Sequence, residues 1–239
     1  MVSRPVIAAF RFGSAILMAA SVIYALLYGS GPILLLYFTI QSNILGIVSL
    51  FLGGLSAISG GRISSYPGLS FIATISLLVT GIIFWCLLSP FVDTPLLSVT
   101  NLCHHLFCPL LVIVDRLLFY YGCAPSPRDA FIAMIHPVLY LVQSVIVGGL
   151  KLVDFDIGWF PYPFLDFYTY GAWVILFVAV FFFAILALAE GWALMERRRD
   201  KKRAQKMLAA LRRRFPEDVC AERYSISFNF CTAIPSAWD

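Results

Sequence analysis

Six apolar segments, each about as long as a bilayer is thick, constrain this chain more than any other feature of its sequence. They cover residues 6–28, 32–55, 69–91, 96–121, 130–150 and 168–192. An α-helix needs about 20 mostly apolar residues to cross the hydrocarbon core of a membrane, and every segment reaches that length. Short stretches rich in glycine, proline and aspartate separate them, as is typical of turns. We therefore expect an all-α fold, a polytopic transmembrane bundle of about six helices.

The composition and the cysteine pattern exclude several other classes of protein. Hydrophobic residues form 61% of the chain and charged residues 13%. A soluble domain carries about 25% charged residues, so a soluble fold is disfavoured. The cysteines show no CxxC spacing and the histidines fall at two different expected depths, which offers no tetrahedral set of ligands. We expect neither a metal nor an organic cofactor.

Basic residues cluster near one end of the chain. Ten of the 17 Lys and Arg residues lie between Arg197 and Arg214, directly after the last apolar segment. Cytoplasmic flanks of membrane spans carry an excess of Lys and Arg, so this block is expected in the cytoplasm, where it can contact anionic lipids. Six spans then place the N-terminus inside as well and the loop 151–167 outside. No folded domain remains to present these charges to a nucleic acid, so we expect no nucleic-acid partner.

This pattern predicts two regions, a six-span transmembrane domain over residues 1–195 and a basic cytoplasmic tail over residues 196–239. The first part of the tail, from Glu196 to Phe215, contains good helix formers and is expected to continue the last span with a solvated face. Within the first span, Arg11 lies about four residues from the inner end. We expect its side chain to snorkel to water, because an ionised group inside a membrane is costly.

Three of the segments carry polar residues on one helical face. They are Ser98, Asn101, His104, His105 and Cys108 in the fourth segment, Thr39, Ser42 and Asn43 in the second, and His136, Tyr140 and Gln143 in the fifth. At about 1.5 Å per residue, Thr39, His105, Gln143 and Tyr140 lie roughly 10–15 Å below the outer boundary, whereas His136 lies in the inner half. For any one of these residues, a hydrogen bond between helices is a sufficient reason for a polar side chain inside a span. Because several of them share one depth in the membrane, they can also form a functional site together.

A hydroxyl and a base in one layer satisfy the chemical requirement of nucleophilic catalysis. Thr39 can serve as nucleophile and either His104 or His105 as its base. We favour His105, because Pro109 has no N–H and so leaves the His105 carbonyl free. Other schemes lack their residues, since the chain contains no HExxH motif and no GxSxG motif.

Ester cleavage also requires hydrogen-bond donors for the developing oxyanion. Asn43 and Gln143 lie at a suitable depth and are ranked together, ahead of Tyr140. The candidate substrate-binding residues are Asn43, Asn101, Tyr140, Gln143 and Asp166.

Three segments carry a resemblance to a known family. They are Tyr37–Asn43, His104–Pro109 continuing to Asp115, and Tyr162–Asp166, in this order. Over about residues 5–192 the chain resembles the androgen-induced and androgen-dependent membrane proteins, and more closely their microbial relatives. The resemblance implies an intramembrane hydrolase of fatty acid esters of hydroxy fatty acids, with Thr39 as nucleophile and a histidine of the fourth span as base. It also implies a lipid ester substrate and the plasma membrane of a microbe.

Two other classes of function stay open from the sequence. One is a non-enzymatic lipid-binding or scaffold protein that uses the polar layer for packing. The other is a small transporter, although a proton-coupled transporter is expected to bury a carboxylate near the midplane and no span does so. The outer aromatic segment 159–164, followed by Asp166, is expected either to line a polar exit for water and product or to form an interfacial aromatic belt.

Overall fold

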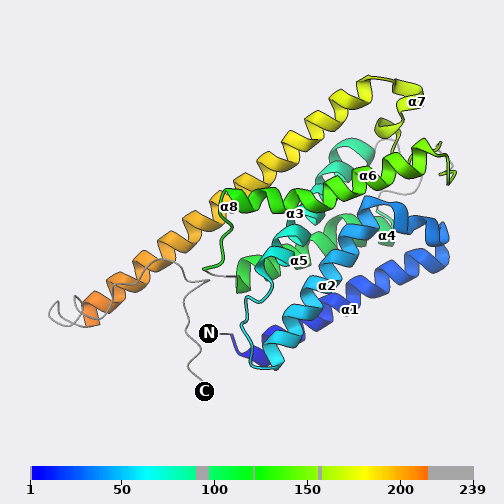
Figure 1. Cartoon of the computed structure of the whole chain (residues 1–239). Helices are drawn as coiled ribbons and strands as arrows, with labels where there is room; N and C mark the ends of the chain where they lie inside the picture. The colour runs from blue at the N-terminus through cyan, green and yellow to red at the C-terminus, as the bar shows by residue number, and fades with distance from the viewer. Residues whose placement is uncertain (1, 90–96, 121, 156–157, 215–239) are drawn as a thin grey trace, which may run out of the picture.

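The computed structural model describes residues 2–89, 97–120, 122–155 and 158–214 (Figure 1). Six of its helices are long and apolar enough to cross a membrane. They cover Arg4–Tyr28, Phe38–Ile58, Pro67–Leu88, Val99–Phe119, Arg128–Gly149 and Trp173–Ala210. The described residues contain no strand, so the predicted all-α polytopic bundle is confirmed. Residues 215–239 of the predicted tail, together with Asp93 to Pro95 and Asp156, lie outside the described residues.

Several of these spans combine helical segments of different types. The elements are α1 (Arg4–Tyr28), η1 (Gly31–Leu36), α2 (Phe38–Ile58), α3 (Pro67–Ile83), η2 (Phe84–Leu88), α4 (Val99–Leu102), η4 (Cys103–Phe107), α5 (Cys108–Phe119), η5 (Arg128–Met134), α6 (Ile135–Gly149), η6 (Pro163–Leu165), α7 (Phe167–Tyr170) and α8 (Trp173–Arg214). Of the short segments, η2 and η4 are π-helical turns, whereas η1, η5 and η6 are 3-10 helices. The second span therefore starts its α-helix at Phe38, six residues later than predicted.

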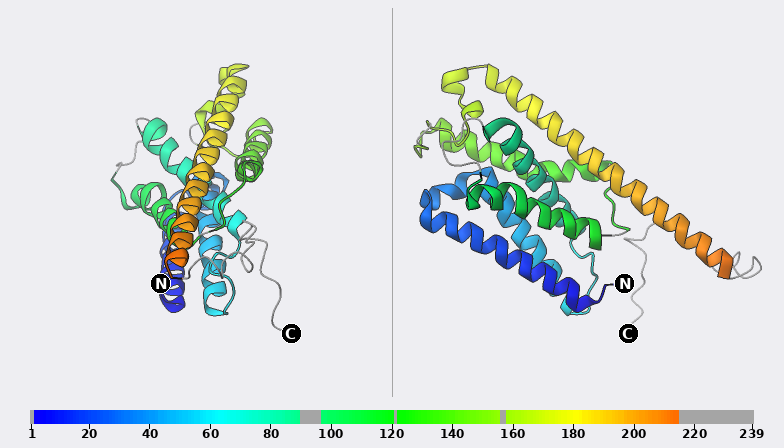
Figure 2. Two further views of the ribbon diagram at one scale, coloured as in Figure 1. Left: turned by 90° about the vertical axis from the view of Figure 1, so that its left-hand side faces the viewer. Right: turned by 180° about the vertical axis from the view of Figure 1, so that it is seen from behind.

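The helices pack in an order that places α2, α3 and α5 at the centre. Helix α1 lies against α2, α2 against α3, and α3 against α5. Helix α8 runs along the outside of the bundle and extends past the other helices at the end where the N-terminus lies (Figures 1 and 2). Its 42 residues continue without a break through the predicted domain boundary after residue 195. The small side chains of Ala189 and Ala193 are completely buried against the bundle, which lets α8 approach closely.

Arg11 does not snorkel, which corrects the expectation from the sequence. Its side chain is completely buried, and its Nε lies 2.7 Å from Oδ1 of Asp115. Its Nη1 also donates to the carbonyls of Gly53 (2.9 Å) and Ile63 (2.7 Å). A buried charge is tolerated when a counter-ion and hydrogen bonds replace its water. Here α5 supplies the counter-ion, and α2 and the loop that follows it supply the carbonyls.

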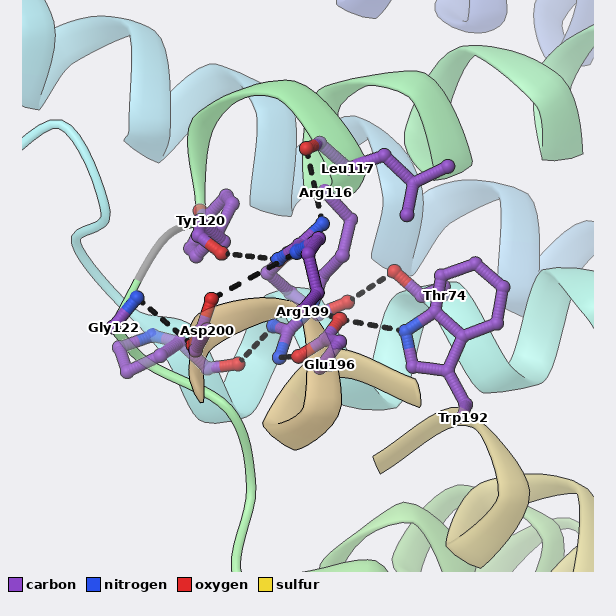
Figure 3. Close-up of polar contacts among 11 residues, drawn as sticks. Thr74, Arg116, Leu117, Tyr120, Gly122, Trp192, Glu196, Arg199 and Asp200 are labelled. Carbon is purple, nitrogen blue, oxygen red and sulfur yellow. Dashed lines mark hydrogen bonds and ion pairs between the residues drawn. The ribbon is translucent and has the colours of Figure 1, made fainter. Parts of the chain in front are cut away.

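Glu196 also differs from its expected place on a solvated helix face. It is completely buried and forms two bonds with Arg116, from Nε to Oε1 (2.8 Å) and from Nη2 to Oε2 (2.9 Å) (Figure 3). The indole of Trp192 donates a third bond to Oε1 at 2.6 Å. The start of the predicted tail is therefore part of the packed bundle, because it carries the counter-ion of a buried arginine.

Candidate functional site

A cavity of about 110 Å³ lies between α2, α3, η4, α6 and α8. Its polar lining comes from five residues, Thr39, Thr80, His105, Tyr140 and Tyr162. The remaining lining is apolar, and consists of Phe38, Val79, Ile83, Leu88, Met134, Pro137, Val138, Leu141, Phe164, Leu165, Val178, Phe181, Phe182 and Ile185. The cavity thus combines a few polar groups with an apolar interior, which is typical of a site for an apolar ligand.

Thr39 is the second residue of α2 and lies half-buried at the cavity. Tyr162 lines the same cavity. No hydrogen bond joins the hydroxyl of Thr39 to His105 in the part of the chain that the structure describes. Both residues nevertheless line the same cavity, although they come from different spans.

His105 lies in the π-helical turn η4, where it packs against α3. Its ring stacks on Phe84 with a centroid distance of 3.7 Å and an interplanar angle of 10°. Its carbonyl accepts a hydrogen bond from the indole Nε1 of Trp85 at 3.2 Å. This is the carbonyl that Pro109 was expected to leave free, and the structure shows the donor that uses it. The close approach depends on Gly81, because a Cβ there would lie 3.1 Å from the same carbonyl oxygen.

His104 faces another part of the bundle and does not line the cavity. It is buried beside the backbone of Ser21 in α1. Its Nε2 is buried without a hydrogen-bond partner among the described residues. The two adjacent histidines therefore have different neighbours, and only His105 shares a cavity with Thr39.

Asn43 and Gln143 lie outside the lining of the cavity, and their amide groups have other partners. The Nδ2 of Asn43 donates to the carbonyl of Thr39 at 2.8 Å and to that of His104 at 3.4 Å. The Nε2 of Gln143 donates to the carbonyl of Leu36 at 3.2 Å, and its Oε1 accepts from Gln41 at 2.8 Å. Asn43 therefore links the start of α2 to η4, and Gln143 links α6 to η1.

The other two candidate substrate-binding residues also lie away from the cavity lining. The backbone N–H of Asn101 donates to the hydroxyl of Ser98 at 3.3 Å, at the start of α4. The carboxylate of Asp166 caps α7 by accepting from the N–H of Tyr168 at 2.9 Å and from the hydroxyl of Thr169 at 2.7 Å. Of the aromatic segment before Asp166, however, Tyr162 and Phe164 reach the cavity.

His136 lies closer to the cavity than its expected depth implies. Its ring stacks on Phe38, which precedes Thr39, with a centroid distance of 4.5 Å. Its Nδ1 lies 2.9 Å from the hydroxyl of Ser76. Residues before it form the 3-10 helix η5, which rises about 2.0 Å per residue and so carries His136 farther from the inner end than an α-helix does.

Two polar residues of the cavity, Thr80 and Tyr162, were not chosen as site residues from the sequence. The hydroxyl of Thr80 lies 2.7 Å from that of Ser42 and donates to the carbonyl of Ser76. Ser76 and Thr80 are four residues apart, and this polar spacing was a signal on an otherwise apolar span. Tyr162 lies in one of the segments that carry the family resemblance, so its position in the sequence was also informative.

No group of three or more His, Cys, Asp or Glu residues that could hold a metal ion occurs among the described residues. Comparison of the chain with known proteins finds no matching family model, no similar curated protein and no similar solved structure.

Proposed function

We propose that this chain is an intramembrane hydrolase of lipid esters, with Thr39 as nucleophile and His105 as general base. The observation that carries the proposal is that a hydroxyl and an imidazole from two different spans line one cavity with an otherwise largely apolar wall. The apolar wall of this cavity suits the acyl part of a lipid ester next to its carbonyl group. Burial of each CH₂ group contributes about 0.8 kcal/mol, so a long chain binds far better than an acetyl group.

The reaction proceeds through an acyl-threonine. The oxygen of Thr39 attacks the carbonyl carbon of the ester while its proton passes to the imidazole of His105. The tetrahedral intermediate then collapses and expels the alcohol oxygen, which takes that proton and leaves as the alcohol. Water attacks the acyl-threonine next and gives a proton to His105, and the second collapse restores Thr39 and releases the fatty acid. Catalytic hydrogen bonds are often long before substrate binds, so the approach of Thr39 to His105 is expected to tighten with an ester present.

Substrate is proposed to reach the cavity laterally from the lipid. Four residues of α8 form one wall of the cavity: Val178, Phe181, Phe182 and Ile185. The neighbouring side chains of Val180 and Phe183 are 58% and 67% exposed, so this part of α8 borders the surface of the bundle that faces lipid. An ester with acyl chains already in the membrane needs to pass only this one helix.

The same proposal places the protein in the plasma membrane of a microbe with both termini in the cytoplasm. The N-terminus and the far end of α8 lie at one end of the bundle, and the basic residues after Glu196 concentrate there (Figures 1 and 2). An excess of Lys and Arg is typical of the cytoplasmic side. The expected partners are the lipid ester substrate and membrane lipids.

Labelling and turnover of the purified protein in lipid vesicles test the hydrolase. A fluorophosphonate probe is expected to modify Thr39, as mapped by mass spectrometry. Thr39→Ala should abolish labelling and lower the turnover of long-chain esters by about 10³-fold or more, because no nucleophile remains. Thr39→Ser keeps a hydroxyl and should retain part of the activity. Thr100→Ala, which removes a threonine hydroxyl outside the cavity lining, is the matched control and should match the wild type.

Two results would contradict the proposal. Full turnover in Thr39→Ala would exclude Thr39 as nucleophile. Saturable binding of a long-chain ester without turnover or labelling would instead favour the non-enzymatic lipid-binding protein.

A further inference from the structure

The first turn of α2 leaves backbone donors available beside Thr39. Helix α2 begins at Phe38 after Tyr37, and no side chain caps it. Its first backbone hydrogen bond runs from the N–H of Gln41 to the carbonyl of Tyr37 at 3.2 Å, so the N–H groups of Phe38 and Thr39 have no acceptor within the helix. The start of a helix also carries a positive partial charge, which favours negative charge nearby.

The segment before α2 is held by side-chain amides. The Nε2 of Gln41 donates to the carbonyl of Leu35 at 2.9 Å, and Gln143 donates to that of Leu36 at 3.2 Å. Two backbone carbonyls of η1 therefore accept hydrogen bonds from side chains. These bonds fix the position of the segment that leads to Thr39. A preorganised backbone is what electrostatic stabilisation of a transition state requires.

Tyr162, which directly precedes η6, lines the cavity beside this first turn. It lines the cavity together with Phe38 and Thr39, the first two residues of α2. Its ring is held edge-on by Tyr37 (5.8 Å between centroids) and stacked by Phe164 (5.4 Å). A phenol hydroxyl can donate its hydrogen to an acceptor in the cavity. Burial raises the pKa of Tyr162 to about 12, so the phenol stays a neutral donor.

Tyr140 supplies a second hydroxyl to the same place. Its side chain is 7% exposed and lines the cavity, yet its hydroxyl has no hydrogen-bond partner among the described residues. Its ring lies edge-on to Phe38 at 5.2 Å and 6.1 Å from the ring of Tyr162. Buried hydroxyls nearly always have a partner, so an unpaired one at a cavity is expected to bind a ligand atom.

We infer that Tyr140 and Tyr162, at the first turn of α2, form the oxyanion-binding site of this hydrolase and also hold the carboxylate of the released fatty acid. This inference rests on the proposed function and names the groups that contact the carbonyl oxygen. The ligand is an oxygen that bears negative charge, first in the tetrahedral intermediate and then in the product. Two hydroxyl donors stabilise that charge more than they stabilise the neutral ester, which is the condition for lowering the barrier.

Removal of each hydroxyl with its ring kept in place tests this site in the full-length protein in vesicles. Tyr140→Phe and Tyr162→Phe should each lower kcat about 10²–10³-fold with little change in KM, because the lost bond forms mainly in the transition state. Tyr168→Phe is the matched control: its hydroxyl donates to the carbonyl of Gly149, away from the cavity lining, and its kcat should stay within a few-fold of the wild type.

A binding measurement that needs no turnover complements the kinetics. The wild type should bind a long-chain fatty acid more tightly than the alcohol of the same chain length, since only the acid is an anion at pH 8. Each Phe variant should weaken binding of the acid about 10-fold or more and leave binding of the alcohol unchanged. Thermal unfolding of each variant, with the wild type beside it, shows whether the fold is intact.

The outcomes separate this inference from the hydrolase proposal. If the wild type is labelled at Thr39 and cleaves esters, but both Phe variants keep kcat and fatty acid affinity, the hydroxyl pair is excluded and the hydrolase stands. If the wild type neither cleaves esters nor is labelled, the hydrolase is excluded. The fatty acid binding measurement then tests by itself whether the hydroxyls of Tyr140 and Tyr162 bind a carboxylate. Equal affinity of the wild type for the fatty acid and the alcohol would then overturn the inferred oxyanion-binding site.

Discussion

At the scale of single residues, the two adjacent histidines show how one turn of backbone creates two environments. His105 lines the cavity with Thr39, whereas His104 is buried against α1. Both lie in the π-helical turn η4, which Pro109 follows closely. A π-helical turn contains an extra residue, and proline removes a donor of the α-helical pattern, so side chains here do not follow α-helical spacing.

Replacement of each histidine by asparagine tests this difference. His105→Asn should lower kcat by about 10²–10⁴-fold, the range that a general base contributes, and should weaken fluorophosphonate labelling of Thr39. His104→Asn should keep kcat within a few-fold, although it is expected to unfold at a lower temperature, because His104 is buried. Turnover in vesicles and thermal unfolding measure the two effects separately. Inactivity of His104→Asn beside an active His105→Asn would reverse the assignment.

At the scale of elements, irregular helices meet at the site. The π-helical turn η2 at the end of α3 lies against η4, where Phe84 stacks on His105 and Trp85 bonds to its carbonyl. On the opposite side, the loop that carries Tyr162 docks on α6 through Phe160, which is 2% exposed. This docking depends on Gly148, since a Cβ there would lie 2.4 Å from the ring of Phe160.

Gly148→Ala is therefore expected to displace Phe160. Overpacking of a buried contact costs about 1–3 kcal/mol, so the free energy of unfolding should fall by that amount. Turnover should fall too, because Tyr162 lies two residues after Phe160. Gly13→Ala in α1 is the control, since a Cβ there meets nothing within 4 Å, and its stability and turnover should not decrease. Unfolding in detergent measures the stability of each variant, and turnover in vesicles measures its activity. Equal results for the two variants would contradict the docking of Phe160 on Gly148.

At the scale of the whole molecule, α8 is held to the bundle at one end. The buried pair of Arg116 with Glu196 joins α5 to α8, and Arg199 donates to the carbonyls of Leu117 (3.0 Å) and Tyr120 (2.7 Å) (Figure 3). Asp200 accepts from the N–H of Gly122 at 2.9 Å. The apolar half of α8 that forms a wall of the cavity is largely exposed. These polar contacts therefore contribute strongly to the position of that wall.

Loss of one partner from the buried pair should destabilise the protein more than loss of both. Glu196→Ala leaves Arg116 buried and unpaired, which costs about 3–5 kcal/mol. The double variant Arg116→Met with Glu196→Leu keeps the volume without a buried charge and should be close to the wild type. The partly exposed pair of Glu190 with Arg197 (3.6 Å) is the control, and Glu190→Ala should cost about 1 kcal/mol or less. Thermal or denaturant unfolding ranks these variants, and a double variant as unstable as Glu196→Ala would contradict the argument.

The orientation of the whole bundle in the membrane is also predicted. Single cysteines at Asp154 and at Lys202, in a cysteine-free background, should react with membrane-impermeant maleimide from opposite sides of the membrane. Lys202 should react only when the cytoplasmic side is accessible, because the basic end of α8 belongs there. Reaction of both from the same side would contradict the six-span arrangement in the membrane.

The sequence by itself determined the number of spans, the class of the fold and most of the span boundaries. These properties depend on the transfer of each segment from water to lipid, which is additive along the chain and needs no knowledge of neighbours. The depth of a residue along its span also depends only on the local sequence. It indicated that Thr39, His105 and Tyr140 lie in one layer of the membrane. The three residues do line one cavity.

Only the tertiary structure decided which side chains meet. Tyr162 and Thr39 line one cavity although they are more than a hundred positions apart in the sequence, and the pairing of Arg11 with Asp115 spans a similar separation. A helix with its polar residues at the right depth can still turn them toward several neighbours, and π-helical and 3-10 turns change that rotation without a clear local signal. Rotation and pairing depend on the packing of all helices together, so the partners of Arg11 and the place of Tyr162 in the site follow from packing and from no single segment.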